Sequence, residues 1–198
     1  QITGSARELL TAERTCLNFL QTLSAVATKT AQFVAHVQGT NAAIVDTRKT
    51  LPGLRVAEKY AVRCGGGKNH RMGLFDAVLI KENHIAAAGG LRPAVEAARR
   101  LAEQAAFIQV EVETITQLQA ALDIGVTMLL LDNMPLERIR EAVRITAGRA
   151  SLEISGGVSF DTLRALAETG VDRISVGGLT KDVKAVDFSM RFSDRPVE

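Results

Sequence analysis

Apolar residues in the N-terminal segment recur at steps of three and four positions. Within residues 5–36 they are Leu9, Leu10, Leu17, Leu20, Leu23, Val26, Ala27 and Phe33, and Val37 follows. This period is that of an amphipathic α-helix, and Gly39 is a suitable end for it. The pattern predicts one long helix, which we treat as a unit of residues 1–38 followed by a second unit of residues 39–198.

Beyond residue 38, short aliphatic runs alternate with helical patterns. The expected strands are residues 42–47, 77–81, 107–113, 127–133, 151–156 and 173–177, and the expected helices are residues 55–64, 93–104, 115–122, 135–146 and 159–168. Most of the strand candidates are interpreted as apolar on both faces. Such strands, alternating with helices, are typical of a parallel sheet that helices cover.

Polar residues at the strand ends distinguish between a doubly wound sheet and a barrel. Charged or polar side chains stand at the C-terminal end of each expected strand, such as Asp46 and Arg48 at the first strand and Asp132 at the fourth. In a β/α barrel these ends meet at one mouth, where sites are built. Six strands are fewer than a closed eight-stranded barrel needs. The sequence therefore predicts an α/β fold: an open or incomplete parallel β/α barrel preceded by a long helix.

Composition narrows the class of protein. The chain has 198 residues, 46% of them hydrophobic, and a formal net charge of +2 from 24 basic and 22 acidic residues. Such a balance gives no electrostatic reason to expect nucleic acid or a membrane as a partner. Cys16 and Cys64 lack redox or metal spacing, so we expect buried free thiols in a cytoplasmic protein. The chain opens within a helical pattern and without Met, so we expect a segment to precede it.

Five potential cations follow the first strand, a triple-glycine loop and the second strand. They are Arg48, Lys49, His70, Arg71 and Lys81. Arginine suits a bidentate grip on carboxylates, and lysine acts as a point charge toward phosphate. The glycines at 65–67 suggest backbone that closely approaches a ligand. The alternative is that each cation is a solvated surface charge.

Two carboxylates and two glycine pairs complete the predicted mouth. Glu111 and Asp132 suit Mg²⁺ held mainly through substrate phosphates, or ribose hydroxyls; the alternative is internal salt bridging to Arg71 or Lys81. Glycine pairs after the last two strands favour a phosphate site, although ordinary βα turns also use them; the residues concerned are Ser155, Gly156, Gly157, Gly177 and Gly178. These residues indicate an enzyme acting on a phosphorylated, multiply anionic substrate.

Longer motifs resemble one family, the quinolinate phosphoribosyltransferases. The matching segments are ERT at 13–15, DTRKTLPGLR at 46–55, KYAV at 59–62, GGGKNHRMGL at 65–74, LIKENH at 79–84, VEVE at 110–113, LDN at 131–133, SGG at 155–157 and GVDRISVG at 170–177. The resemblance covers essentially the whole chain. It implies transfer of phosphoribose from phosphoribosyl pyrophosphate to quinolinate with decarboxylation, giving nicotinate mononucleotide, carbon dioxide and pyrophosphate in NAD biosynthesis.

The resemblance also implies roles for individual residues. Quinolinate would be held by Thr47, Arg48, His70, Arg71 and Lys81, and by Arg14 from the other subunit of a homodimer. Catalytic roles would fall to Lys49, which faces the pyrophosphate, and to Lys81, Glu111 and Asp132, the two carboxylates also holding ribose and Mg²⁺. Residues 155–157 with Gly177 and Gly178 would receive the 5′-phosphate.

Two features depart from the family pattern. An N-terminal α/β sandwich domain usually precedes the first helix and is missing here, and Lys181 stands where many members have histidine. Two alternatives stay open: a related barrel acting on another substrate, and a phosphate-ligand binding module without turnover. Three cations near one mouth, Arg48, Arg71 and Lys81, favour a dicarboxylate.

Overall fold

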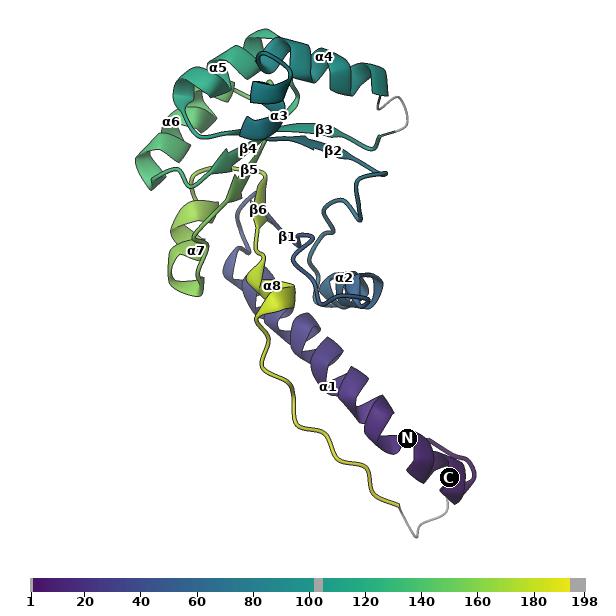
Figure 1. Ribbon diagram of the computed structural model, residues 1–198. Helices are drawn as coiled ribbons and strands as arrows, with labels where there is room; N and C mark the ends of the chain where they lie inside the picture. Colours follow the sequence, from purple (N-terminus) through teal and green to yellow (C-terminus); the bar gives the residue numbers. More distant parts are fainter. Residues whose placement is uncertain (1, 102–104, 193–198) are drawn as a thin grey trace.

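The core of the protein is a parallel six-stranded sheet with helices on one side (Figure 1). The computed structural model describes residues 2–101 and 105–192 of the 198. The strands are β1 (Ala43–Val45), β2 (Val78–Ile80), β3 (Ile108–Val112), β4 (Met128–Asp132), β5 (Ser151–Ser155) and β6 (Arg173–Ser175). Each lies within an expected range, and every pairing is parallel. The α/β fold and its barrel-like sheet are confirmed.

The strand order explains why the barrel is open. It runs β1-β6-β5-β4-β3-β2, so the first strand pairs with the last, and β1 and β2 stand at the two edges. In the loop before β2, Lys68 forms a single parallel bridge with Val45. The opening therefore lies between the first two strands, beside the residues that connect them.

Most helices begin and end near the expected residues. They are α1 (Ala6–His36), α2 (Arg55–Cys64), α3 (Glu82–Ala87), α4 (Leu91–Leu101), α5 (Ile115–Asp123), α6 (Leu136–Thr146), α7 (Phe160–Ala167) and α8 (Gly178–Lys181). The end predicted for α4, at residues 102–104, lies outside the described residues. The short helices α3 and α8 were not predicted, because neither is long enough to show a helical period.

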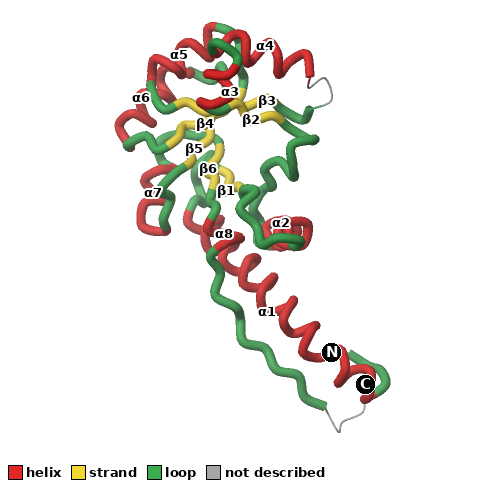
Figure 2. The backbone as a smooth tube through the Cα atoms, viewed as in Figure 1, coloured by secondary structure: helices red, strands yellow, loops and turns green. Residues whose placement is uncertain are grey.

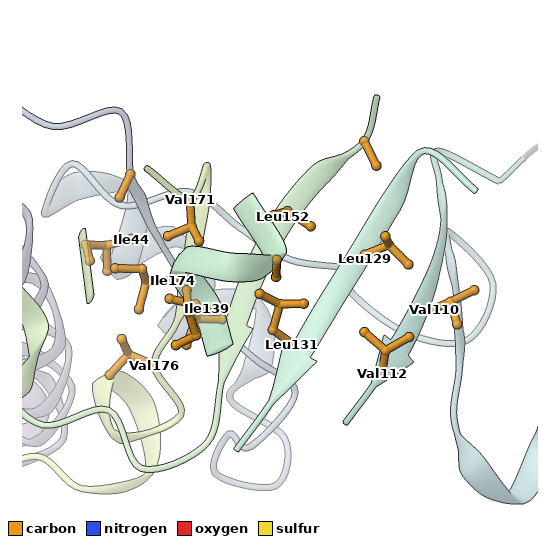
Figure 3. Close-up of a cluster of buried hydrophobic side chains, with 14 of the residues drawn as sticks. Ile44, Val110, Val112, Leu129, Leu131, Ile139, Leu152, Val171, Ile174 and Val176 are labelled. Atoms are coloured by element: carbon orange, nitrogen blue, oxygen red, sulfur yellow. The ribbon is translucent and has the colours of Figure 1, made fainter. Parts of the chain in front are cut away.

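The two faces of the sheet differ, so the prediction of strands apolar on both faces is wrong for β3, β5 and β6. One face is aliphatic and packs under the helices: Val110, Leu129 and Ile174 are fully buried there (Figure 3). On the other face, register pairs Leu130 with Glu111 and with Glu153, and Glu153 with Arg173. Side chains alternate along a strand, so the strands place apolar residues under the helices and mostly polar residues inside the barrel.

The triple-glycine loop packs against α1, which corrects the expectation of a ligand contact there. A Cβ on Gly65 would lie 2.4 Å from the Ala27 carbonyl oxygen, and one on Gly67 would lie 2.8 Å from the Thr30 methyl. Gly66 has φ +83°, a conformation that favours glycine. The glycines therefore allow α1 and the end of α2 to approach closely.

The N-terminal part of α1 extends away from the sheet, and the C-terminal segment that follows α8 runs beside it as a loop (Figure 2). The Val186 backbone N–H donates to the Gln21 carbonyl at 3.1 Å. Cys16, in this part of α1, and Cys64, at the end of α2, are both exposed free thiols. The expectation of buried thiols is wrong, because both positions lie on helix faces turned from the core. Among the described helices, none combines the length and apolar character that crossing a membrane requires.

Candidate functional site

A cavity of about 410 Å³ lies on the polar face of the sheet. Most of the predicted site residues line it, namely Thr47, Arg48, Lys49, His70, Arg71, Lys81, Glu111 and Ser155, and they are joined there by Arg55, Leu79, Leu130, Glu153 and Ser175. Cations from the β1 and β2 ends thus face carboxylates from β3 and β5. The arrangement suits a ligand that carries several negative charges.

Arg55 fixes the loop that presents Arg48 and Lys49. Its Nε donates to Thr50 Oγ1 at 3.1 Å, and its two terminal nitrogens donate to the carbonyls of Met72 and Arg48, each at 3.1 Å. One guanidinium therefore ties the loop after β1 to the loop before β2. Rigid placement of both loops keeps their cations at the cavity.

A buried ion pair supports the loop that leads to His70. The Lys59 ammonium contacts Asp46 Oδ1 and donates to the His70 carbonyl at 3.0 Å. Asp46 also accepts from the His70 backbone N–H at 2.8 Å and from the Asn69 amide. Burial raises the pKa of Asp46, while the bonds from Lys59, His70 and Asn69 act to lower it. Removing either charge would leave the other buried and unpaired.

Both ring nitrogens of His70 are engaged by the protein. Its Nε2 lies 2.9 Å from Gln109 Oε1, and its Nδ1 accepts from the Arg71 backbone N–H at 2.7 Å. Burial lowers the pKa of His70; the Glu153 charge and the Gln109 hydrogen bond oppose this shift. The geometry therefore favours a neutral imidazole.

Arg71 is the most buried of the predicted arginines. Its side chain donates to the Ala77 carbonyl at 3.3 Å, and burial followed by the Arg48 charge lowers its pKa, with Asp76 opposing. An arginine keeps its charge even so. A guanidinium that repels Arg48 and has lost most of its water is ready to bind a carboxylate.

Lys81 and Glu111 are neighbours at the ends of the paired strands β2 and β3, and both line the cavity. Lys81 Nζ lies 2.5 Å from Glu111 Oε2, so the internal salt bridge considered for Glu111 is present. Lys81 also precedes α3 directly, where its backbone N–H donates to His84 Nδ1 at 2.9 Å. Its ammonium stays accessible, since the side chain is 44% exposed, and can contact a ligand in the cavity.

Asp132 and the glycine loops adjoin the cavity without lining it. Asp132 is register-paired with Ser155 and accepts from the Asn133 amide at 2.8 Å. Gly156 has φ +88°, and a Cβ there would lie 2.0 Å from Asn133 Oδ1. A Cβ on Gly177 would lie 3.0 Å from Lys49 Cδ. Gly157 follows Gly156, and Gly178 is the first residue of α8. The Gly177 backbone therefore lies next to Lys49, and the Gly156 backbone lies next to Asn133.

The carboxylates of Glu111 and Asp132 are the side chains to consider for a metal ion. In the described part of the chain, no three His, Cys, Asp or Glu side chains are grouped to hold an ion. Glu111 and Asp132 lie diagonally on one face, because Glu111 pairs with Leu130, two positions before Asp132. Two carboxylates in this arrangement would suit Mg²⁺, which takes most of its ligands from water and phosphate oxygens.

Arg14 is the predicted residue that lies far from the cavity. It is exposed on the projecting part of α1, roughly 22 Å along the helix axis from Lys29 at about 1.5 Å per residue. Lys29 itself donates to the Gly178 carbonyl at 3.0 Å, so this part of α1 lies beside the predicted phosphate-binding glycines. Arg14 does not line the cavity of its own chain.

Sequence reasoning missed the residues at the cavity floor. Glu153 is fully buried and accepts from Arg173 Nε at 2.8 Å, from Gln109 Nε2 at 3.2 Å and from the Ser175 hydroxyl. The same alternation that pointed to Glu111 was present, since Glu153 stands between Leu152 and Ile154. It was overlooked because it lies in mid-strand and not at a strand end.

Comparison with known proteins agrees with this geometry. The family model described as quinolinate phosphoribosyl transferase, C-terminal domain, matches residues 26–191. The chain is 45% identical to a probable nicotinate-nucleotide pyrophosphorylase [carboxylating] of Bacillus subtilis and 47% identical to the corresponding Mycobacterium leprae protein, each over 96% of this chain. It spans 66% and 67% of their lengths.

A solved structure has the same fold. The crystal structure of NadC from Streptococcus pyogenes superposes with a TM-score of 0.91 at 45% identity, over 96% of this chain and 66% of that one. The match therefore includes the sheet, the helices and the loops that form the cavity. On these grounds the chain belongs to the quinolinate phosphoribosyltransferase family.

Proposed function

We propose that the protein transfers phosphoribose from phosphoribosyl pyrophosphate to quinolinate and releases nicotinate mononucleotide, carbon dioxide and pyrophosphate. The observation that carries the proposal is the gathering of Arg48, Lys49, Arg71 and Lys81 around one cavity. A dicarboxylate beside a polyphosphate needs such a set of cations. Membership of the family supports the same reaction.

The quinolinate subsite is formed by the cations of the β1 and β2 ends. Arg48 and Arg71 bind its carboxylates with their planar guanidinium groups, while Lys81 supplies a point charge and Thr47 a hydroxyl. Lys81 leaves Glu111 in part when the ligand binds, since its ammonium is the accessible member of that pair. This subsite lies against the His70 loop.

The phosphoribosyl subsite lies on the side of β3 to β6. Lys49 faces the pyrophosphate, Glu111 and Asp132 hold ribose hydroxyls and Mg²⁺, and the glycine loops beginning at Ser155 and Gly177 receive the 5′-phosphate. When bound, Mg²⁺ neutralises part of the pyrophosphate charge. Gly156 and Gly177 support this assignment, because side chains there would collide with Asn133 and press on Lys49.

The reaction needs positioning and charge, and no covalent nucleophile. The C1–O bond to pyrophosphate breaks with its electron pair on oxygen, the quinolinate nitrogen forms the new bond to C1, and the C2 carboxylate leaves as carbon dioxide. Its bonding pair stays on the ring carbon, which then takes up a proton. Fixed cations around the ring favour the negative charge that develops there.

Arg14 enters the proposal through a homodimer. Its position on the projecting part of α1 takes it away from the cavity of its own chain, and a two-fold axis would bring it to the cavity of a second copy. Mixing Arg14→Ala with Lys81→Ala subunits tests this. Recovery of activity, with neither parent active, supports a shared site; an Arg14→Ala protein with full activity sinks it.

The central test joins turnover to binding. Nicotinate mononucleotide formation is measured from quinolinate, phosphoribosyl pyrophosphate and Mg²⁺, with nicotinate as the competing substrate, and quinolinate binding is followed by calorimetry. We expect quinolinate to be used and bound, and nicotinate to compete poorly because it lacks one carboxylate. Preference for nicotinate would indicate a related barrel with another substrate. Binding of phosphoribosyl pyrophosphate without turnover would indicate a binding module.

A further inference from the structure

The floor of the cavity contains a chain of polar side chains to which the proposed reaction gives no role. Glu153 and Gln109 are both fully buried, and Glu153 lies below His70 with 3.6 Å between its Oε1 and His70 Nε2. Three donors converge on the Glu153 carboxylate, from Gln109, Arg173 and Ser175. Such a group in the interior costs stability unless each oxygen is satisfied.

The chemistry of the groups fixes the direction of each hydrogen bond. A carboxylate only accepts, so Gln109 must turn its amide NH₂ toward Glu153 and its carbonyl oxygen toward His70. His70 Nε2 must therefore carry a hydrogen. At the other side of the ring, the Arg71 backbone N–H only donates, so Nδ1 must carry none.

These constraints leave one form of His70. The Nε2–H tautomer satisfies both neighbours, whereas an imidazolium would set Nδ1–H against the Arg71 N–H at 2.7 Å. The charges around the ring are Glu153, Arg173 and Lys59. The opposite tautomer would place a bare Nε2 against the Gln109 carbonyl, two acceptors at 2.9 Å.

We propose that Glu153 and Gln109 are positioning residues that hold His70 as its neutral Nε2–H tautomer, and that His70 thereby fixes the backbone of Arg71 at the cavity. This inference rests on the proposed function for the role of Arg71. It changes the role of His70, which acts on quinolinate through Arg71 and donates no hydrogen bond to quinolinate, because its Nε2–H donates to Gln109. Glu153 orients the Gln109 amide, and Gln109 orients the His70 ring; we call these three side chains the relay.

The first test needs no variant. ¹⁵N NMR of the imidazoles separates a protonated from a bare ring nitrogen, and the exposed His36 and His84 serve as internal references. We expect His70 to show a protonated Nε2 and a bare Nδ1 at neutral pH. An Nδ1–H tautomer or an imidazolium for His70 at neutral pH would overturn the proposal.

The second test changes the relay. Gln109→Leu removes the acceptor for Nε2, and Glu153→Gln allows the Gln109 amide to turn over, because a carboxamide can donate as well as accept. Each should give mixed His70 tautomers and raise the Kd and KM for quinolinate roughly tenfold, with phosphoribosyl pyrophosphate affinity changed less than about twofold. The matched control Gln119→Leu, at an exposed position of α5, should change neither.

The outcomes separate the two proposals. Unchanged tautomer and unchanged quinolinate affinity in both folded variants would sink the relay, as would an equal loss of affinity for both substrates. If the unaltered protein neither binds nor uses quinolinate, the proposed function fails, and the NMR measurement alone then decides the relay.

Discussion

The two faces of the parallel sheet are built from alternate residues of the same strands, yet they serve different ends. On β3, Val110 and Val112 are buried under the helices, whereas Gln109 and Glu111 belong to the cavity side. On β5, Leu152 and Ile154 flank the charged Glu153. Burial on the helical face stabilises the fold; hydrogen bonds on the other face orient the cations. Changes on one face should therefore leave the property of the other largely unaffected.

The largest expected effect is on the cavity face. Lys81→Ala should lower kcat/KM for quinolinate by about a thousandfold or more, roughly 4 kcal/mol of transition-state stabilisation, since it removes a cation that touches substrate. Its effect on the free energy of unfolding should stay within about 2 kcal/mol, the cost of leaving Glu111 unpaired. Steady-state kinetics and urea denaturation measure the two.

Lys184→Ala, at an exposed position of the C-terminal segment, is the matched control and should alter neither quantity. If Lys81→Ala unfolds the protein and retains its activity per folded molecule, the distinction between the faces fails.

The next effect belongs to the helical face. Leu129→Ala should destabilise the fold by about 2–5 kcal/mol, because Leu129 is fully buried and its loss leaves a cavity. Turnover per folded molecule should change little. Leu101→Ala, where the side chain is 88% exposed, should cost less than about 0.5 kcal/mol. Loss of turnover in folded Leu129→Ala would show that the faces are coupled.

A smaller effect should distinguish the phosphoribosyl subsite from the quinolinate subsite of the cavity. Asp132→Asn should lower kcat/KM for phosphoribosyl pyrophosphate about a hundredfold, roughly 2.7 kcal/mol, and change quinolinate affinity little, since Asp132 borders the glycine loops. Glu111→Gln should act in the same direction. Asp187→Asn, exposed in the C-terminal segment, is the control, and equal losses for both substrates would contradict the assignment.

The smallest effect concerns pH. Burial lowers the pKa of His70 in the folded protein, so between that pKa and its unfolded value of about 6.5 the unfolded chain binds more protons. The stability contributed by neutral His70 is present above about pH 6.5 and is lost as pH falls through the folded pKa. Denaturation at about pH 7.5 and 5.5 should show a fall that His70→Asn reduces, by less than about 1 kcal/mol. An identical fall in the variant would argue against a buried neutral ring.

The sequence predicted the strands and long helices because their periods are local properties. It also brought together Arg48, Arg71 and Lys81, since parallel strand ends meet at one edge. It did not show which face of each strand packs under the helices, because the register between distant strands decides that. The packing of Gly65 against Ala27 was also missed, because it too depends on contacts between distant segments. Small residues are the sequence signal of such a close helix crossing, and they have other uses as well.

Roles that depend on other molecules stay predictions. Examples are the position of Arg14 in a second copy and Mg²⁺ at Glu111 and Asp132. The cytoplasmic location and the division at residue 38 also stay predictions. Glu153 differs from them, because its strand pattern was visible in the sequence and only its partners, Gln109 and Arg173, were not.

The pairing of β1 with β6 also determines when the site can form. Lys49 and Thr180 are 131 positions apart, yet the Thr180 hydroxyl donates to the Lys49 carbonyl at 2.8 Å. Closing so long a loop is slow compared with local helix formation, and during synthesis β1 must wait for almost all later strands. Until then, among the described residues, Lys68 alone forms a β-bridge with β1 from a position close in the sequence. The cavity should therefore be among the last parts of the molecule to acquire its native structure.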